Sequence, residues 1–276
     1  SSGEGTRHLA AKAAERALAA AGVAPEELDI IILGTSSPDR NYPSDACSVQ
    51  AAIGAVNAVA FDISAACAGF IFAMNIVEGF FKAGIYKTAL IIGAETLSKV
   101  TDWSDRGTCV LFGDGAGAAV LKAEETGIID MMMGADGTKG DVLACTSRTV
   151  GNFLTGTKPE LGFMTMDGQE VFKFAVRKVP ESVMELLQRT GTKKEDIKYY
   201  VLHQANERII EAAARRLKEP MEKFPMTISQ FGNTSTASIP LLLDDMIQKD
   251  MLKRGDKIIM SGFGAGMTWG AVLMEW

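Results

Sequence analysis

Histidine and cysteine are scarce in this chain. Its 276 residues include two histidines and four cysteines, and no two of the cysteines form a C-x-x-C pair. Structural zinc sites are usually built from cysteines and histidines at such short spacings. The scarcity therefore argues against a zinc site, and we expect reduced thiols and no bound metal.

Long apolar runs are also missing. Wholly apolar stretches such as Ala89–Ile92 are far shorter than the roughly 20 residues that a membrane helix requires, and no signal-peptide pattern opens the chain. With 47% hydrophobic and 22% charged residues, the chain can bury a sizeable core. We therefore expect a globular, cytoplasmic protein that has no membrane partner.

An excess of positive charge is absent as well. The chain has 28 lysines and arginines against 34 aspartates and glutamates, which gives a formal net charge of −6. This balance argues against a general polyanion binder, so we expect no nucleic-acid partner. A local basic patch is still compatible with it, and a predicted helix over Glu207–Leu217 supplies Arg208, Arg215 and Arg216.

What the sequence does contain is an internal repeat. Leu18–Gly22 followed by Pro25–Leu33 resembles Leu187–Gly191 followed by Lys194–Leu202, and the numbering of the two copies differs by a constant offset of 169. Each copy predicts a helix that ends at a glycine, then a short acidic turn and an apolar strand. The likeness continues more weakly into the next turn, helix and strand of both copies.

A duplicated α/β unit explains this pattern better than chance. Strands that alternate with helices imply mainly parallel sheets covered by helices, and we expect a pseudo-twofold axis between the two halves. Each half is predicted to close with a glycine-rich hairpin, at Phe112–Gly117 and at Phe263–Gly266. The predicted division is 1–125 for the first half, 126–168 for a connecting segment and 169–276 for the second half.

Cys67 stands where a predicted strand, Ala60–Ile63, gives way to a helix that begins near Ala68. A thiol at a helix N-terminus faces unpaired amide donors and the positive end of the helix dipole, which favour the thiolate. A small buried cysteine that only fills space is nevertheless the more common case. Taken alone, Cys67 is therefore weak evidence for a nucleophile.

Two polar residues of the second half are candidates to act with this cysteine. His203 follows the predicted strand Tyr199–Leu202, and residues just past strand ends project into the ligand crevice of α/β folds. Asn233 roughly corresponds to Cys67 in the repeat, and its amide can donate to a developing oxyanion. The alternatives are a capped structural histidine and an ordinary N-cap asparagine. The repeat favours a shared site, because it brings the three side chains together.

These residues belong to six motifs: Ala65–Phe70, Asp105–Thr108, Phe112–Ala118, His203–Asn206, Gly232–Ser235 and Phe263–Gly270. In their order and spacing, the motifs resemble the β-ketoacyl-acyl carrier protein synthase III group of the thiolase superfamily. The resemblance covers essentially the whole chain. It implies the five-layered αβαβα thiolase fold, built from two duplicated halves, and a homodimer.

The resemblance also implies a reaction. Cys67 is expected to take an acyl group from acyl-CoA, with acetyl-CoA as the expected primer, and His203 and Asn233 to handle the malonyl group of malonyl-acyl carrier protein. Loss of carbon dioxide gives a carbanion that attacks the acyl-cysteine in a decarboxylative Claisen condensation. The product is a 3-oxoacyl-acyl carrier protein at the start of fatty acid synthesis. No cofactor is implied beyond the CoA thioester, which is a substrate.

Further residues match family positions. The backbone amide of Ala265 is expected to serve a second oxyanion hole, and Phe263 to screen the nucleophile and favour release of uncharged carbon dioxide. Tyr42 matches a residue that reaches into the acyl pocket of the partner subunit, and the connector around Phe153–Phe163 is another candidate lining segment. Lys173 and Arg208 match family positions that contact the phosphopantetheine arm or its phosphates, and Asn206 is a further expected contact. Arg215 and Arg216, on the same predicted helix as Arg208, form the local basic patch for the carrier protein, and an ordinary solvated helix face is the alternative for these basic residues.

The resemblance has one large departure. Family members usually begin with a strand and a segment whose tryptophan and arginine sandwich the CoA adenine, whereas this chain opens in a predicted helix, Thr6–Ala21. The strand is expected to be internal to its sheet, and loss of an internal strand leaves backbone groups unpaired. We therefore expect the sequence to be an incomplete part of a longer chain.

Other functions stay open on the residues alone. A condensing enzyme for polyketide or quinolone intermediates would keep the same three residues, and primer length and branching are not fixed by the sequence. The hydroxymethylglutaryl-CoA type needs a glutamate as general base beside the cysteine. No residue near Cys67 in the sequence supplies one, and Glu95 is left open as the candidate. A non-catalytic carrier-docking subunit and a cysteine hydrolase are the remaining alternatives.

Overall fold

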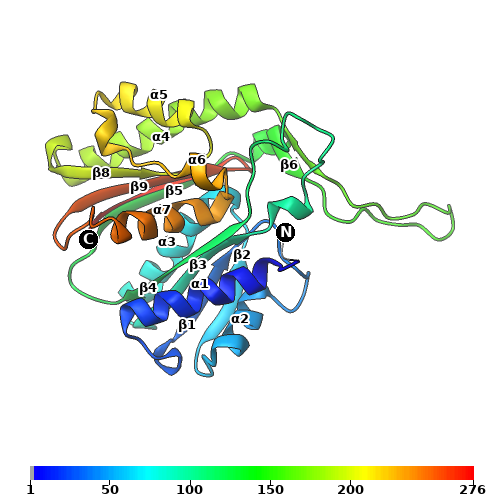
Figure 1. Ribbon diagram of the computed structural model, residues 1–276, viewed down its shortest axis with the longest axis horizontal. Coiled ribbons are helices and arrows are strands. Elements are labelled where there is room, and N and C mark those ends of the chain that lie inside the picture. The colour runs from blue at the N-terminus through cyan, green and yellow to red at the C-terminus, as the bar shows by residue number, and fades with distance from the viewer. Residues whose placement is uncertain (1–2) are drawn as a thin grey trace.

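The computed structural model describes residues 3–276 and arranges them in five layers (Figure 1). Two four-stranded sheets lie face to face across a layer of helices, and further helices cover the outer face of each sheet. Three separate apolar cores fill the spaces between the layers. The layer order is the predicted αβαβα.

The first sheet has the strand order β2-β1-β3-β4. β1 is parallel to β2 and β3, whereas β4 is antiparallel to β3. Helices α1 and α2 cover the outer face of this sheet. The elements are α1 (Thr6–Ala21), β1 (Ile30–Gly34), α2 (Asp45–Ile53), β2 (Val59–Ile63), β3 (Thr88–Glu95) and β4 (Gly115–Lys122).

The second sheet has the strand order β5-β10-β9-β8. β8 is parallel to β9, and β10 is antiparallel to both β9 and β5. Helices α4 and α5 cover its outer face. The elements are β5 (Ile128–Ala135), α4 (Gly168–Thr190), β8 (Ile197–Leu202), α5 (Glu207–Leu217), β9 (Lys257–Gly264) and β10 (Thr268–Glu275).

The middle layer holds α3 (Gly69–Lys82) and α7 (Ser238–Gln248), and a short helix, α6 (Ile228–Phe231), precedes α7. Both long helices pack into one core with strands from the two sheets. Helices that lie between two sheets are apolar on more than one face, which explains the strongly apolar sequence of α3. Within the described residues, no helix combines the length and apolarity that crossing a membrane requires.

The repeat appears in the structure at its predicted offset. Short 3₁₀ turns begin at Pro25 and Lys194, and β3 and β9 begin at Thr88 and Lys257, so both pairs keep the offset of 169. The correspondence is strict over this part of the two halves. It confirms the duplicated fold.

The strict offset corrects one detail of the predicted site. Two further 3₁₀ turns, Ala66–Ala68 and Ser235–Ala237, have the same offset and lead directly into α3 and α7. The residue equivalent to Cys67 is therefore Thr236, whereas Asn233 corresponds to Ser64. Asn233 reaches the site from just before its turn, and not from the position that the cysteine occupies in the first half.

The glycine-rich segment of the first half is not a hairpin turn, which corrects a second prediction. Gly115 and Gly117 lie within β4, and residues 96–114 connect β3 to β4. A Cβ atom at Gly117 would lie 2.8 Å from the Cβ of Pro240. The glycines therefore allow α7 to pack closely on β4. In the second half, β9 and β10 do form a tight hairpin.

The predicted connecting segment is more structured than its sequence indicates. Its first part is β5, which pairs with β10 at the edge of the second sheet. The rest forms an arm that projects from the body, with β6 (Leu143–Cys145) and β7 (Met164–Met166) at its root (Figure 1). The division at 125 and 168 stays a proposal, and the structure adds that β5 shares the sheet of the second half.

The edge of β4 distinguishes the two sheets. β10 pairs with β5 on its outer side, but within residues 3–276 its counterpart β4 has no strand there. By analogy with β5, a strand added beside β4 would occupy the edge of the sheet. The analogy favours an edge position, and the expectation that the family's first strand is internal stays a prediction.

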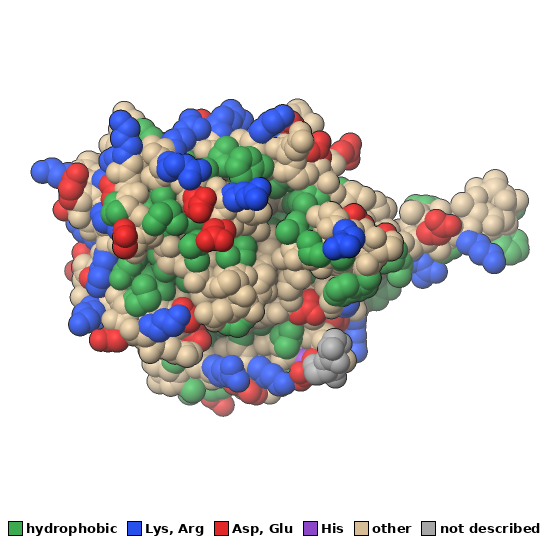
Figure 2. Space-filling model, turned by 45° about the horizontal axis from the view of Figure 1, so that its top comes forward, with side chains coloured by type: hydrophobic (Ala, Val, Ile, Leu, Met, Phe, Trp, Pro, Cys, Tyr) green, Lys and Arg blue, Asp and Glu red, His purple; other side chains and the backbone are tan. Residues whose placement is uncertain are grey.

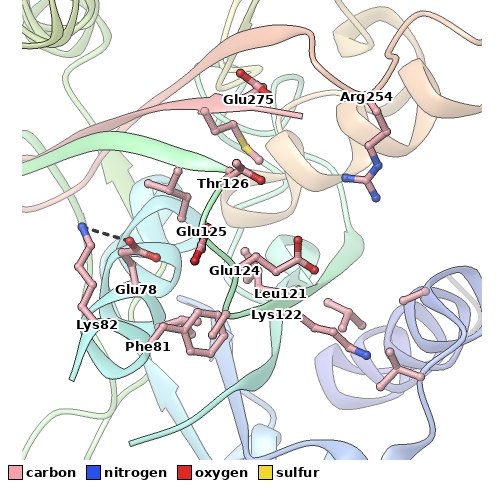
Figure 3. A pocket seen from close by; sticks show the side chains of 18 residues that line it. Glu78, Phe81, Lys82, Leu121, Lys122, Glu124, Glu125, Thr126, Arg254 and Glu275 are labelled. Atoms are coloured by element: carbon pink, nitrogen blue, oxygen red, sulfur yellow. Dashed lines mark ion pairs between the residues drawn. The ribbon is translucent and has the colours of Figure 1, made fainter. Parts of the chain in front are cut away.

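A hollow of about 710 Å³ lies where β4 ends (Figure 3). Charged side chains from α3, from the end of β4 and from the C-terminal region surround it, including Glu78, Lys82, Lys122 and Arg254. Glu78 and Lys82 pair with each other at 3.1 Å. None of the predicted catalytic residues lines this hollow, so the candidate site lies elsewhere.

Candidate functional site

The predicted catalytic side chains line a smaller pocket, of about 120 Å³. Cys67 from the first half and His203 and Asn233 from the second half all line it, together with Asn206 and Phe263. The other lining residues are mainly apolar: Leu111, Phe112, Leu143, Met166, Gly168, Val171, Phe172, Ala205, Ile209 and Gly264. The pocket therefore combines a few polar groups with an apolar wall, as is typical of small-molecule sites.

Cys67 lies in the 3₁₀ turn that leads into α3, and its side chain is 6% exposed. The end of β9 passes directly beside its backbone. A Cβ atom at Gly264 would lie 2.6 Å from the amide nitrogen of Cys67. This close approach requires a glycine at 264, because any side chain there would collide with the turn that carries the cysteine.

Two opposing influences act on the protonation state of Cys67. Burial raises the pKa of the thiol to about 12, and the negative charge of Glu95 adds to this, while a hydrogen bond from Ser235 opposes it. Burial therefore favours the neutral thiol at pH 7, because an anion in an apolar pocket loses its hydration. This effect is opposite to that of the helix N-terminus, so the preference for thiolate stays a prediction.

His203 follows the last residue of β8, and its ring is fixed from two sides. Its backbone N–H donates to the carbonyl of Ser261 at 2.8 Å, and Nδ1 lies 2.6 Å from Oγ of Ser238. The ring also meets Phe263 edge-on, with 5.3 Å between ring centroids. Burial lowers the pKa of His203 to about 3, so the imidazole is neutral at physiological pH.

Asn233 is held by its backbone and by its side-chain oxygen. Its N–H donates to Leu111 and its carbonyl accepts from Gly113, each at 2.9 Å, which ties it to the loop before β4. Oδ1 accepts the N–H of Ser235 at 2.8 Å. The side-chain NH₂ has no hydrogen-bond partner among residues 3–276. Asn233 is therefore oriented as a donor in the pocket.

Glu95, the candidate general base, is buried and does not line the pocket. The carboxylate links the loop after β1 to the turn before α7, because it accepts hydrogen bonds from both. Its donors, at 2.5 to 3.2 Å, are the hydroxyls of Thr35, Ser36, Ser37, Ser235 and Thr236 and the backbone N–H of Ser36. This carboxylate holds the two halves together and is not available to a substrate.

Two of the predicted support residues lie at the end of β9 and just beyond it. Phe263 lines the pocket and packs against His203, and its role in screening the nucleophile stays a prediction. Ala265 lies in the turn between β9 and β10, where its carbonyl accepts from Thr268 at 3.1 Å, and its neighbour Gly264 lines the pocket instead. The assignment of an oxyanion donor to Ala265 stays a prediction.

The predicted carrier contacts lie on α4 and α5, and most of them already have partners. Asn206 caps α5 by accepting from the N–H of Arg208 at 2.9 Å, and it lines the pocket. Arg208 is exposed and makes no ion pair with any described residue. The other three form ion pairs: Lys173 with Glu170 at 2.8 Å, Arg215 with Glu211 at 3.7 Å and Arg216 with Glu181 at 3.7 Å.

The surface over these helices mixes the two signs of charge. Figure 2 shows lysine and arginine side chains gathered along the upper part of the molecule, with acidic side chains among them. The predicted basic patch is therefore partly neutralised. Arg208, next to the pocket-lining Asn206 and Ile209, is the member best placed to meet an anion.

The two predicted acyl-pocket segments do not line the pocket of this chain. Tyr42 is 85% exposed in the loop before α2, and Phe153 is 99% exposed on the projecting arm. The root of the arm lines the pocket instead, through Leu143 and Met166. That Tyr42 reaches into a partner subunit stays a prediction.

Sequence reasoning missed Ser238 and the hydroxyl groups around Glu95. These serines and threonines lie in segments that read as ordinary turns, so their composition gives no signal. The repeat does give a signal for these residues, because its strict offset aligns Ser235–Ser238 with Ala66–Gly69, the turn that carries the cysteine.

Comparison with known proteins decides the family. The β-ketoacyl-[acyl-carrier-protein] synthase III of Clostridium acetobutylicum is 51% identical over 275 residues, which cover 99% of this chain and 85% of that relative. The chain belongs to the β-ketoacyl-[acyl-carrier-protein] synthase III family. The relative from Clostridium novyi is also 51% identical, over 100% of this chain and 86% of its own length.

Family models and solved structures agree. The model of 3-oxoacyl-[acyl-carrier-protein] synthase III matches residues 61–137, and that of its C-terminal part matches residues 187–276. The crystal structure of the 3-oxoacyl-[acyl-carrier-protein] synthase III from Aquifex aeolicus superposes with a TM-score of 0.92 at 45% identity, over 100% of this chain and 86% of that one.

The predicted family, the thiolase-type α/β fold and the enzyme class are thereby confirmed. The chain is an acyltransferase of the condensing type, from the family that initiates fatty acid synthesis by condensing an acyl-CoA with malonyl-acyl carrier protein. What each side chain does in that reaction is a separate question, which rests on the geometry of the pocket.

Proposed function

We propose that Cys67 carries the acyl group and that His203 and Asn233 stabilise the negative charge formed when malonyl-acyl carrier protein loses carbon dioxide. The observation that carries the proposal is the single pocket that all three side chains line, although they come from different halves of the chain. The pocket offers one sulfur nucleophile and two neutral donors. That is the set of groups a decarboxylative condensation needs.

In the first half-reaction, the sulfur of Cys67 attacks the thioester carbon of acyl-CoA. The carbon–sulfur bond to CoA breaks, the new thioester forms on Cys67, and the proton lost by the thiol leaves with the CoA sulfur. One thioester replaces another, so the activation of the acyl group is preserved. Backbone amides at Cys67 and Ala265 are the proposed donors to the oxyanion of this step and of the later attack.

In the second half-reaction, the bond between the malonyl α-carbon and its carboxylate breaks and carbon dioxide leaves. The electron pair forms an enolate, and His203 and Asn233 donate hydrogen bonds to its oxygen. The α-carbon then attacks the acyl carbonyl, and the thiolate of Cys67 leaves and regains a proton. The apolar wall supports this step, because a dry site favours loss of the charged carboxylate as neutral carbon dioxide and excludes water.

The finer parts of the proposal concern substrates and assembly. The small pocket volume supports a short primer such as acetyl-CoA. Arg208 is the proposed contact for the phosphopantetheine arm or the acidic carrier protein, since it is exposed beside the pocket and makes no ion pair within the described part of the chain. We further propose a cytoplasmic homodimer, with Tyr42 reaching the partner's pocket and no cofactor beyond the CoA thioester.

Intact-mass spectrometry with a panel of acyl-CoA primers tests the function. Acetyl-CoA should add one acetyl group to Cys67, and branched or longer primers should add less. Subsequent malonyl-acyl carrier protein should remove the group, with release of carbon dioxide and formation of a 3-oxoacyl-acyl carrier protein. Absence of acyl-enzyme with every primer would refute the role of Cys67. Loss of the acyl group to water faster than to malonyl-acyl carrier protein would indicate a hydrolase.

A further inference from the structure

Ser238, the first residue of α7, lies against the ring of His203. Its Oγ is 2.6 Å from Nδ1 of the histidine and accepts a 3.3 Å hydrogen bond from the backbone N–H of Gln204. Both side chains are 2% exposed, so solvent does not compete for these groups. The ring of His203 therefore faces a hydroxyl on one side and the pocket on the other.

The single proton of the Ser238 hydroxyl limits which ring nitrogen is protonated. Within residues 3–276, Nδ1 of His203 is the one acceptor with which this hydroxyl forms a hydrogen bond. If Nδ1 carried the ring proton, Oγ would accept from both Nδ1 and Gln204, and its own buried O–H would have no acceptor. If Nδ1 is bare, every one of these groups is satisfied. The second arrangement is favoured because an unmade buried hydrogen bond is costly.

We propose that Ser238 is a positioning residue that donates to Nδ1 and thereby holds the neutral ring of His203 in the tautomer with its proton on Nε2. This inference rests on the proposed role of His203 as a donor to the enolate oxygen. Nε2 has no hydrogen-bond partner among the described residues, and the ring lines the pocket. In this tautomer the histidine offers a donor to the pocket, whereas the other tautomer would offer an acceptor and repel the enolate.

The repeat shows that the scaffold places these two positions together in both halves. At the offset of 169, Gly34 is equivalent to His203 and Gly69 to Ser238. A Cβ atom at Gly34 would lie 3.2 Å from the backbone carbonyl carbon of Gly69 and 2.8 Å from the methyl group of Thr236. In the first half the two positions are glycines whose backbones pack directly together. In the second half the equivalent positions hold the imidazole of His203 and the hydroxyl of Ser238.

Nitrogen NMR reads the tautomer directly. Protein labelled with ¹⁵N-histidine contains only His8 and His203, and His8→Gln removes the exposed one and assigns the other. At pH 7, His203 should show a protonated Nε2 and a bare Nδ1. In Ser238→Ala the ring should shift toward the Nδ1–H form or a mixture, and Ser238→Thr, which keeps the hydroxyl, should restore the wild-type pattern.

Separate assays of the two half-reactions connect the tautomer to function. Ser238→Ala should slow decarboxylation of malonyl-acyl carrier protein by about 10- to 100-fold, below the effect expected for deleting an oxyanion donor. Acylation of Cys67 should stay within about twofold, because no role in that step is assigned to His203. Ser182→Ala is the matched control: Ser182 is equally buried, and its hydroxyl donates to Lys178 within α4 at 2.8 Å.

A bare Nε2 and a protonated Nδ1 in the wild-type protein would overturn the inference, whatever the activities are. An unchanged tautomer in Ser238→Ala, or an equal loss in both half-reactions, would also overturn it. These results leave the wild-type condensation assay untouched, so they are distinct from failure of the proposed function. That failure would appear as a wild-type protein that shows the expected tautomer and forms no acyl-enzyme.

Discussion

The turn at Ala66–Ala68 in the first half and the turn at Ser235–Ala237 in the second have the same backbone. Both are single 3₁₀ turns that lead into a long helix, and their first residues have φ of 46° and 50°. The side chains differ, because Cys67 is equivalent to Thr236. One backbone geometry therefore supports a nucleophile in one half and a structural hydroxyl in the other.

Each turn is also held by the opposite half. A Cβ atom at Gly93, in the first sheet, would lie 2.4 Å from the carbonyl oxygen of Thr236, and one at Gly264, in the second sheet, would lie 2.6 Å from the nitrogen of Cys67. These contacts cross between the halves in both directions. Neither half therefore forms the catalytic pocket alone, since a glycine in a strand of each half fixes the position of the turn in the other half.

Among these changes, replacing the nucleophile should have the largest effect, because it removes the side chain that distinguishes the first turn from the second. Cys67→Ala gives the first half a turn without a reactive group, as in the second half, and should lower acyl transfer by at least about 10³-fold, as loss of a covalent nucleophile does. Intact mass after incubation with acetyl-CoA measures the effect. The exposed Cys145→Ala is the control and should acylate normally. Retained acylation in Cys67→Ala would show that another residue carries the acyl group.

The pH dependence of alkylation tests the protonation state of Cys67 in the first turn. Since burial raises the pKa of Cys67 to about 12, the thiolate fraction should rise about tenfold for each pH unit between 7 and 10. Iodoacetamide labelling of Cys67, followed by peptide mass mapping, should therefore accelerate by roughly three decades over this range. A plateau near neutral pH would mean that the helix N-terminus stabilises the thiolate after all.

The close contacts of Gly93 and Gly264 with the turns of the opposite half, called cross-packing below, predict a smaller effect, on stability. Gly93→Ala forces a methyl group against the backbone of Thr236 and should lower the free energy of unfolding by about 2 kcal/mol, a typical cost of overpacking. Gly79→Ala is the matched control, because no atom lies within 4 Å of the added Cβ and its helix favours alanine. It should stabilise the protein by about 0.5 to 1 kcal/mol. Denaturant titration measures both, and equal changes would refute the cross-packing.

The sequence predicted the parts of the fold that depend on local pattern. The apolar runs and terminal glycines of the repeat located the strands and helices, and the offset of 169 appears unchanged in the structure. Cys67, His203 and Asn233 were predicted to be neighbours because the repeat places them at related strand ends and turns. In the structure, all three side chains line one pocket.

Long-range contacts explain what the sequence did not predict. The raised pKa of Cys67 depends on how many apolar neighbours exclude water, which no local motif encodes. Ser238 is the first residue of α7 and reads in the sequence as an ordinary turn residue, and only the packing of α7 beside β8 brings it to His203. Similarly, β5 joins the second sheet by pairing with β10, the last strand of the chain, although residues 136–267 separate the two strands in sequence.

The division of labour between the halves is tested most directly by measuring both half-reactions in His203→Ala and Asn233→Ala. Both variants should still form the acetyl-enzyme at Cys67 at close to the wild-type rate, while decarboxylation and condensation should fall by about 10²- to 10³-fold, the usual cost of removing an oxyanion donor. Equal losses in acylation and condensation would contradict the assignment, because they would make the two residues part of the apparatus that loads the cysteine.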